Sequence, residues 1–434
     1  MEQRDGKTPQ NVCADKKIEQ YRQRQVSPAV FVLADNPLRP FGTPPLTKGR
    51  LAGGHSMSTT TISSHHFAKT DKLPLSFLFC ICYNGISEKI QFSYGGNFMR
   101  YQKLGNTDID VSVVSLGCWA LGGGSVWTDK DSTVAEVKNL LDACKAQGIN
   151  YLDTAPVYGT GVSEELLGEA LKGRRSDFIV QSKCSLNWRN EGGNFHYERD
   201  GYTVNNDTRA AAIKKDVEDS LRRMQLDYMD SVIVHYVCKT FPVEETVGAL
   251  EDLIKEGKIR TYGLSNSQPA DLHEYKAAKT RVTDGVSVVQ EFFSILSPFH
   301  GRDYFEACKK YNTVFQTYGV LEEGFLTSPS FMDKEFKKTD IRARLPWVGE
   351  SYKEGLRKAF AIWEPMCKQH NCSFAQLVEA WALTQYDRMS LLVGMRKPEN
   401  VADNAKCVDI KLSAEEIRMM EEAVKAIQVE VLDK

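Results

Sequence analysis

The chain has 434 residues, of which 42% are hydrophobic and 26% are charged, enough to bury a large core. Its formal net charge of −2, without a basic stripe interleaved with aromatic residues, argues against nucleic acid as a partner. The longest apolar run, residues 73–83, is about half the length that a bilayer requires, so no membrane span is predicted. Eleven scattered cysteines without a C-x-x-C pair predict no metal site and suit a reducing compartment such as the cytoplasm.

Residues 1–98 differ in character from the rest of the chain. Serine, threonine and histidine cluster at 58–66, several prolines occur, and no hydrophobic periodicity is sustained. Such a composition favours a low-order, disordered extension. Two alternatives stay open: a segment that targets an organelle, with translation starting at Met57, and a start assigned too early, since Met99 opens the ordered region. One folded domain is expected at 99–434.

From Met99 the apolar pattern alternates between strands and helices after a short hairpin-like start. Eight apolar runs predict strands at 111–117, 150–155, 178–183, 231–236, 260–265, 285–290, 313–318 and 391–394. Stretches with helical spacing predict helices at 134–146, 163–171, 208–224, 243–256, 268–278, 301–311, 355–386, 398–406 and 412–424. A polar insertion rich in Gly and Asn spans about 186–207.

The eight predicted strands are apolar throughout, which is typical of a parallel sheet covered on both faces. Eight strand–helix units over roughly 300 residues favour an α/β fold closed as a (β/α)8 TIM barrel over an open doubly wound sheet. Ser163 is expected to cap the helix at 163–171, because its hydroxyl can accept from first-turn amides. The stretch Leu412-Ser-Ala-Glu-Glu is expected to open the last helix with a capping box.

Four chemically active residues follow the ends of successive predicted strands. Asp153 and Tyr158 lie on a bent loop after the second strand, Lys183 ends the third and His235 ends the fourth. A parallel barrel builds its active site from these strand ends. Any one of these side chains alone is more simply a structural group, but all four together favour an enzyme site.

The four residues suit the reduction of a carbonyl group. A free tyrosine has a pKa of about 10, and a nearby ammonium is expected to lower that pKa toward the range of general acid catalysis. Lys183 would be this cation and Asp153 its anchor. His235 would orient the substrate oxygen, and Tyr158 would donate the proton.

Several motifs, in a fixed order from Met99 to about Ile427, resemble those of the aldo-keto reductases: Asp153-x4-Tyr158, Lys183, His235, Gly257-Lys-Ile-Arg260 and Gly263-Leu-Ser-Asn266. The resemblance implies a barrel that reduces aldehydes and ketones with NADP(H), with NAD(H) also possible. It also implies that Tyr158, Lys183, Asp153 and His235 are catalytic. The insertion after Lys183 and the segment 340–346 look most like the microbial stress-response and plant-type branches.

Matching positions imply a cofactor site in three parts. Ser265, Asn266, Gln290 and Tyr318 match the nicotinamide contacts, Gly319 and Leu321 lie in the pyrophosphate loop, and the adenosine-phosphate segment holds Gly394, Arg396, Asn400, Asp403 and Asn404. Many family members have Ser-Pro-Leu where this chain has Gly319-Val-Leu321, and Arg or Gln where it has Asn400. The second change weakens the case for NADP over NAD. There are two structural alternatives: that Tyr318 simply packs in the core, and that Arg396 lies in a solvated turn.

Aromatic residues in the predicted loops are candidates for the substrate pocket. They are Trp119, Trp127, Trp188, Tyr236 and Phe325, which would favour an apolar or aromatic carbonyl compound. Packing beneath the barrel rim is the alternative for each. The segment Gly159-Thr-Gly161-Val-Ser-Glu164 resembles a dinucleotide fingerprint but lacks its third glycine, so we interpret it as the loop that presents Tyr158.

Two other functions are compatible with the same residues. The family resemblance extends to channel β subunits, so a non-enzymatic NADP(H)-sensing regulatory subunit is one alternative. A dehydrogenase that runs toward oxidation is another. Residues that bind the cofactor serve all three functions, and the sequence leaves the physiological substrate and the oligomeric state open.

Overall fold

The computed structural model describes residues 99–124, 126–127, 132–279 and 283–429, and the backbone of two earlier strands. These strands, β1 (Leu78–Tyr83) and β2 (Ile86–Gln91), pair antiparallel. No regular element was predicted there. The remainder of the predicted 1–98 extension lies outside the described residues.

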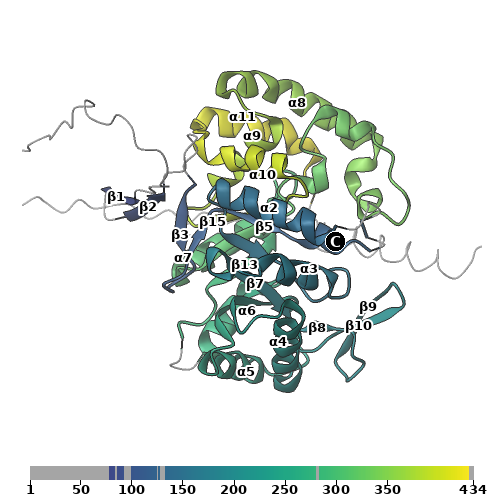
Figure 1. Cartoon of the computed structure of the whole chain (residues 1–434). Helices are drawn as coiled ribbons and strands as arrows, with labels where there is room; N and C mark the ends of the chain where they lie inside the picture. The colour runs from purple at the N-terminus through teal and green to yellow at the C-terminus, as the bar shows by residue number, and fades with distance from the viewer. Residues whose placement is uncertain are drawn as a thin grey trace, which may run out of the picture. The chain divides into compact units, whose positions relative to one another are not determined.

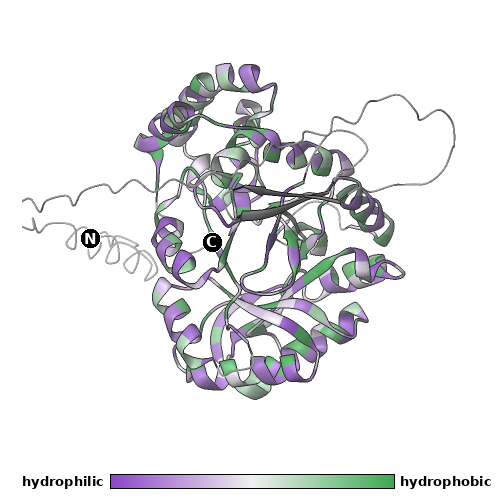
Figure 2. Cartoon of the chain, turned by 90° about the vertical axis from the view of Figure 1, so that its left-hand side faces the viewer, coloured by the Kyte–Doolittle hydropathy of each residue, from purple (hydrophilic) through white to green (hydrophobic). Residues whose placement is uncertain are grey.

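Eight parallel strands close into a barrel (Figures 1 and 2), which confirms the predicted (β/α)8 fold. They follow one another around the barrel in chain order, and the last pairs with the first through Leu391 and Val114. The strands are β5 (Val114–Gly117), β6 (Tyr151–Asp153), β7 (Ile179–Cys184), β11 (Met229–Val234), β12 (Ile259–Ser265), β13 (Val288–Phe292), β14 (Val314–Tyr318) and β15 (Met389–Gly394).

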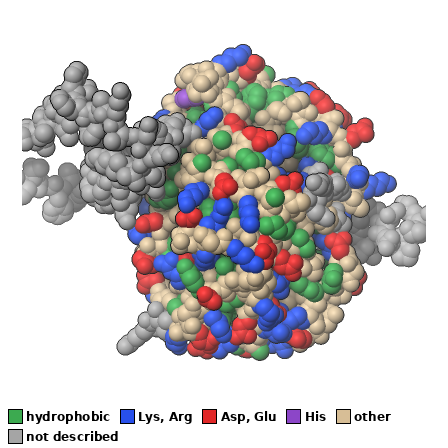
Figure 3. Space-filling view, viewed as in Figure 1, with side chains coloured by type: hydrophobic (Ala, Val, Ile, Leu, Met, Phe, Trp, Pro, Cys, Tyr) green, Lys and Arg blue, Asp and Glu red, His purple; other side chains and the backbone are tan. Residues whose placement is uncertain are grey.

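Ten α-helices of the described chain surround the barrel. They are α2 (Val134–Ala146), α3 (Val162–Leu171), α4 (Ala210–Met224), α5 (Val243–Lys255), α6 (Pro269–Ala278), α7 (Phe299–Tyr311), α8 (Glu350–His370), α9 (Phe374–Leu383), α10 (Pro398–Asn404) and α11 (Ala414–Val424). None of the described helices is long and apolar enough to cross a bilayer. On the face shown in Figure 3, acidic and basic side chains are interspersed.

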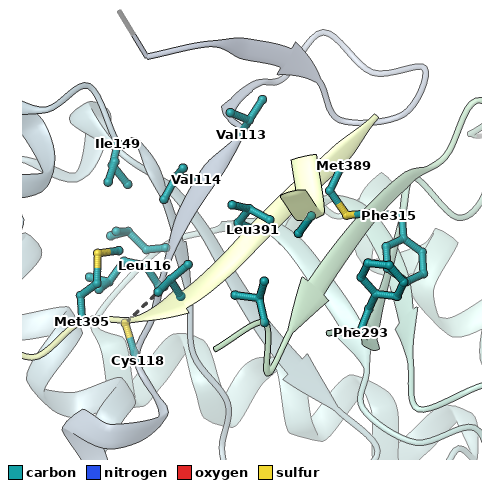
Figure 4. Packing of buried hydrophobic residues seen from close by; sticks show 14 of the residues in the cluster. Val113, Val114, Leu116, Cys118, Ile149, Phe293, Phe315, Met389, Leu391 and Met395 are labelled. Atoms are coloured by element: carbon teal, nitrogen blue, oxygen red, sulfur yellow. Dashed lines mark hydrogen bonds between the residues drawn. The ribbon is translucent and has the colours of Figure 1, made fainter. Parts of the chain in front are cut away.

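The main core lies between the outer face of the barrel and the helices. Leu116 of β5 and Leu391 of β15 belong to it, and the neighbouring Phe293 and Phe315 lie close together in Figure 4. The Phe293 ring also stacks on Trp381 of α9 at 5.4 Å between centroids. Because every strand buries its outward side chains under a helix, each reads as an apolar run in the sequence.

A short hairpin closes the amino-terminal end of the barrel. It consists of β3 (Tyr101–Lys103) and β4 (Asp110–Ser112), paired antiparallel. Its apolar side chains form a second buried cluster with inward-facing residues of the strands, three of which, Tyr151, Val288 and Val314, begin their strands: Leu104, Ile109, Val111, Tyr151, Ile233, Val288 and Val314. This cluster fills the amino-terminal end of the barrel, at the opposite end from the carboxyl ends of its strands.

Two connections at the carboxyl ends are longer than the others. The predicted insertion after β7 is an antiparallel sheet in the order β8 (Leu186–Asn187), β10 (Tyr202–Asn206), β9 (Asn194–Arg199). Figure 1 shows β9 and β10 projecting away from the barrel. The connection between β14 and α8 contains the 3-10 turns η3 (Glu322–Gly324), η4 (Pro329–Asp333), η5 (Ile341–Arg344) and η6 (Pro346–Val348).

Two predictions of helical detail are wrong. The single helix expected at 355–386 is divided into α8 and α9, because Asn371 adopts a left-handed conformation with φ of 49° and Ser373 caps the new helix. Ser163 does not cap α3, whose cap position is Gly161 with φ of 98°. The Ser163 hydroxyl instead donates to the carbonyl of Cys118. The capping box predicted for the last helix is confirmed at Ser413.

Candidate active site

A cavity of ≈ 410 Å³ opens at the carboxyl ends of the barrel strands. Its wall combines strand ends with the long connections that follow them. The residues that line it include Trp119, Trp127, Asp153, Tyr158, His196, Tyr197, Arg199, His235, Tyr236, Ser265, Asn266, Gln290, Tyr318, Gly319, Leu321, Glu323, Ile341, Arg342, Gly394 and Arg396.

The structure brings the four strand-end residues together. Lys183 Nζ lies 2.6 Å from Asp153 Oδ2 and donates to the Tyr158 hydroxyl oxygen at 3.0 Å. It also donates to the Thr154 carbonyl at 2.9 Å. The His235 ring stands edge-on to the Tyr158 ring, with 6.1 Å between centroids. Acid, amine, phenol and imidazole thus form one contiguous group beneath the cavity.

Lys183 and Asp153 form a buried ion pair. Their side chains are 0% and 1% exposed. Burial lowers the pKa of Lys183, and the adjacent Asp153 carboxylate opposes that shift. A buried ion pair of this kind holds its geometry only when its remaining hydrogen-bonding groups are also satisfied.

Three glutamine side chains provide those partners inside the barrel. Gln181 Nε2 and Gln290 Nε2 donate to Asp153 Oδ1 at 2.7 and 2.9 Å. Both also donate to Gln316 Oε1 at 2.8 Å, and Gln316 Nε2 donates to Ser115 Oγ at 3.0 Å. Gln290, predicted as a nicotinamide contact, lines the cavity and also supports Asp153. Gln181 and Gln316 were not predicted, because inward-facing glutamines leave no mark on an apolar strand pattern.

The loop that carries Tyr158 is fixed by close backbone contact. Gly159 has φ of 62°, and a side chain there would collide with the Gly122 backbone. Conversely, a Cβ at Gly122 would lie 2.6 Å from the Tyr158 carbonyl oxygen. The Gly159–Gly161 segment therefore connects β6 to α3 and positions Tyr158.

Burial, and not the ammonium, dominates the titration of the phenol. Burial raises the pKa of Tyr158 well above 10, and the negative charge of Asp153 adds to the shift. The net shift is therefore opposite to the lowering by Lys183 that the sequence predicts. Burial also lowers the pKa of His235 well below 6.5, with Lys183 and His196 adding to the shift. At neutral pH the site therefore holds a protonated phenol and a neutral imidazole.

The residues matched to the nicotinamide end form one hydrogen-bonded group on the cavity wall. The Tyr318 hydroxyl donates to Asn266 Oδ1 at 2.6 Å, and Asn266 Nδ2 donates to the His235 carbonyl at 2.9 Å. Ser265 Oγ donates to the Gln290 carbonyl at 2.6 Å. Gly319 has φ of 73° and lies against the Phe292 ring, so this position has no room for a side chain. This explains why the chain has glycine where many family members have the serine of Ser-Pro-Leu.

The residues matched to the adenosine end divide into two groups. Gly394 and Arg396 line the cavity. Asn400, Asp403 and Asn404 lie on α10 and do not line it. The Asp403 carboxylate accepts from Gln376 Nε2 at 2.7 Å and from Ser373 Oγ at 3.3 Å, so it also ties α10 to α9.

Only some of the aromatic residues predicted for the substrate pocket line the cavity. Trp119, Trp127 and Tyr236 line the cavity. Trp188 does not: its ring packs edge-on against Tyr202 and under the Arg223 guanidinium. Phe325 is fully buried beneath the rim, against Phe331 and Phe336.

Sequence reasoning missed two groups of lining residues, and both lie on the long connections. His196, Tyr197 and Arg199 come from β9, and Ile341 and Arg342 come from η5. The sequence signals for these residues were the length of the two connections and the resemblance of both to particular branches of the family, since loops after barrel strands carry specificity.

A nicotinamide dinucleotide fits the groups that are present. His235 Nδ1 is buried and has no hydrogen-bond partner among the described residues, and amide and hydroxyl groups converge at Ser265, Asn266 and Gln290. The cavity continues from Tyr158 to Gly394, where an added Cβ would meet nothing within 4 Å, and to the Arg396 guanidinium. Among the described residues, no cluster of three or more His, Cys, Asp or Glu side chains could hold a metal ion.

Comparison with known proteins agrees with this architecture. The Aldo/keto reductase family model matches residues 113–425. An NADH-specific methylglyoxal reductase of Escherichia coli is 32% identical over 338 residues, which are 76% of this chain and 100% of the relative. A probable voltage-gated potassium channel subunit beta of Oryza sativa is 28% identical, over 72% of this chain and 92% of the relative.

A solved structure shows the same relationship. The glycerol dehydrogenase AKR11B4 from Gluconobacter oxydans superimposes with a TM-score of 0.66 at 28% identity, covering 75% of this chain and 95% of that one. The fold is that of a barrel oxidoreductase. The chain belongs to the aldo/keto reductase family, which confirms the resemblance seen in the sequence.

Replacing Asp153 with Asn tests the buried ion pair. The Lys183 ammonium would lose its counter-charge in a dry site, so we expect the free energy of unfolding in urea to fall by about 3–5 kcal/mol. The control is Asp142→Asn, since the exposed Asp142 pairs with Arg174 at the surface; it should cost about 1 kcal/mol or less. Equal, small losses in both variants would contradict a structural role for the pair.

Proposed function

We propose that this protein reduces aldehydes or ketones to alcohols with a nicotinamide cofactor, and that Tyr158 is the general acid. One observation carries the proposal. The buried Lys183 ammonium lies 3.0 Å from the Tyr158 hydroxyl oxygen and is held there by Asp153. Because Lys183 donates to this oxygen, the phenol's own hydrogen is left for a carbonyl oxygen in the cavity.

The bound cofactor would supply the hydride that adds to the carbonyl carbon. Tyr158 transfers its proton to the carbonyl oxygen as negative charge develops there, and Lys183 stabilises the phenolate that remains. His235, neutral at physiological pH, donates a hydrogen bond that orients the carbonyl oxygen. Lys183 is fully buried and Tyr158 is half-buried, so the contact between them is largely shielded from water, which strengthens it.

The observations on the choice between NADP(H) and NAD(H) point in opposite directions. Arg396 supports NADP(H), because a guanidinium on the cavity wall suits a 2′-phosphate. Asn400 and the NADH-specific E. coli relative support NAD(H). We propose NADP(H) with NAD(H) as a working alternative, and kcat/KM with each cofactor decides between them.

A regulatory role is the second candidate, favoured by the similarity to the rice channel subunit beta. It requires cofactor binding without turnover. Oxidation of an alcohol is also compatible with the site, as the similarity to a glycerol dehydrogenase indicates. We further propose a cytoplasmic location, since the cysteines of the described chain are all free thiols.

Replacing Tyr158 with Phe tests the acid. With 4-nitrobenzaldehyde and NADPH or NADH, we expect the wild-type protein to consume cofactor and the variant to lose at least about 100-fold in kcat, since general acid catalysis contributes roughly that much. Cofactor affinity, measured by fluorescence titration, should stay nearly unchanged. Retained turnover would remove Tyr158 from the role. Wild-type protein that binds cofactor and leaves the aldehyde untouched would favour the regulatory function.

The pH dependence of reduction follows from three shifted pKa values. Tyr158 must be protonated, and its raised pKa keeps it so until the pH exceeds the usual tyrosine value of about 10. His235 must be neutral, and its lowered pKa keeps it so at about pH 6.5 and above. Lys183 must be charged, and because burial lowers its pKa, its loss of a proton sets the alkaline limit. We therefore expect kcat/KM for reduction to be flat across neutral pH and to fall at alkaline pH as Lys183 loses its proton. A pH profile in which kcat/KM changes with a midpoint near neutral pH would contradict these protonation states.

Deleting residues 1–98 tests the proposed domain boundary. Since the barrel closes among residues after Met99, we expect a truncated protein with an unchanged kcat and an unchanged thermal unfolding midpoint. The alignment that covers the whole E. coli relative with 76% of this chain supports this expectation. Loss of folding or of turnover would make the extension part of the functional domain.

A further inference from the structure

The sheet inserted after β7 contributes a distinct group to the cavity wall. The His196 ring lies 4.4 Å from the Tyr236 ring, and the Arg199 guanidinium lies 4.6 Å from the centre of the Tyr197 ring. All four side chains line the cavity. One strand of the insertion thus places an imidazole, a phenol and a guanidinium beside the proposed reaction centre.

Three other charged residues on this cavity wall have a partner or an assigned role. Asp153 is paired with Lys183. Arg342 donates two hydrogen bonds to the buried Asp340 carboxylate, at 2.8 and 2.6 Å. Arg396 lies with Gly394 at the strand end that we assign to the cofactor.

Arg199 differs from these groups, since no ion pair joins it to a carboxylate of the described residues. The adjacent Asp200 lines a smaller neighbouring recess and not the cavity. Glu323, a further acid on the cavity wall, belongs to η3 on the connection after β14. Arg199 is half-buried and presents a positive charge to the cavity. No carboxylate of the described residues forms an ion pair with that charge.

Arg199 and the proposed acid, Tyr158, line the same cavity. The Tyr236 ring lies 5.5 Å from the His235 ring, which itself lies 6.1 Å from the Tyr158 ring. The Trp119 ring lies 6.1 Å from the Tyr158 ring and lines both the cavity and the recess that Arg199 borders. The space between Tyr158 and Arg199 is thus bounded by aromatic rings.

We propose that Arg199 determines substrate specificity by binding a carboxylate on the substrate, several atoms from the carbonyl that is reduced. A guanidinium binds a carboxylate through two parallel hydrogen bonds, and partial burial strengthens the pair. The aromatic walls suit a flat or apolar spacer. The preferred substrate class is then an aldehyde or ketone acid with such a spacer, a refinement that rests on the proposed reductase function.

The test compares 4-carboxybenzaldehyde with 4-methylbenzaldehyde, which has a similar shape without the charge. We expect wild-type kcat/KM to favour the carboxylate by about tenfold or more, the usual effect of a charged hydrogen bond. Arg199→Gln should abolish the preference by raising KM at unchanged kcat, because the contact is equal in the ground and transition states. Arg199→Lys should retain part of it.

The matched control is Arg222→Gln, since Arg222 is exposed on α4 and pairs with Asp219. It should keep the wild-type preference. A wild-type protein without preference for the carboxylate, or an Arg199→Gln variant that keeps the preference, would overturn the proposal even while both aldehydes are reduced.

A binding measurement separates this proposal from the reductase assignment. Isothermal titration of the protein with benzoate should give an affinity that Arg199→Gln weakens by about tenfold. If neither aldehyde is reduced but this difference is found, the anion site stands and the proposed reaction fails. If benzoate binds equally to both proteins, or to neither, Arg199 is not an anion site.

Discussion

A lysine ammonium buried against an aspartate carboxylate is the contact on which the site depends. The Lys183 side chain is fully shielded from solvent, so Asp153 must remain within hydrogen-bonding distance to stabilise its charge. The pair fixes the ammonium under the Tyr158 hydroxyl oxygen. Since the two charges come from adjacent strands, β6 and β7, closure of the barrel is what brings them together.

The interior of the barrel is adapted to hold that pair. Toward the amino-terminal end it is apolar and is closed by the β3–β4 hairpin. Beneath the cavity it is polar, because Gln181, Gln290 and Gln316 link Asp153 to neighbouring strands through their amides. A carboxylate held by two amide donors and an ammonium cannot turn away without leaving buried groups unsatisfied. Rigidity at the site thus comes from the same strands that form the core.

The residues that we expect to select the substrate, in contrast, lie on the two long connections. The insertion after β7 and the 3-10 turns after β14 contribute β9 and η5 to the cavity wall. Their side chains meet aromatic residues from the barrel loops, such as Tyr236 beside His196. Because these connections do not determine closure of the barrel, their residues can differ among family members that share one fold.

Local patterns in the sequence determined the eight strands, nearly all helices and the positions of Asp153, Tyr158, Lys183 and His235. A strand buried on both faces is apolar throughout, and a polar residue at its end is visible without knowledge of its neighbours. What depends on packing between distant segments could not be predicted. The placement of Trp188 outside the cavity, the arrival of Arg199 within it and the raised pKa of Tyr158 were decided by tertiary structure alone, because burial and loop direction are set by residues remote in the chain.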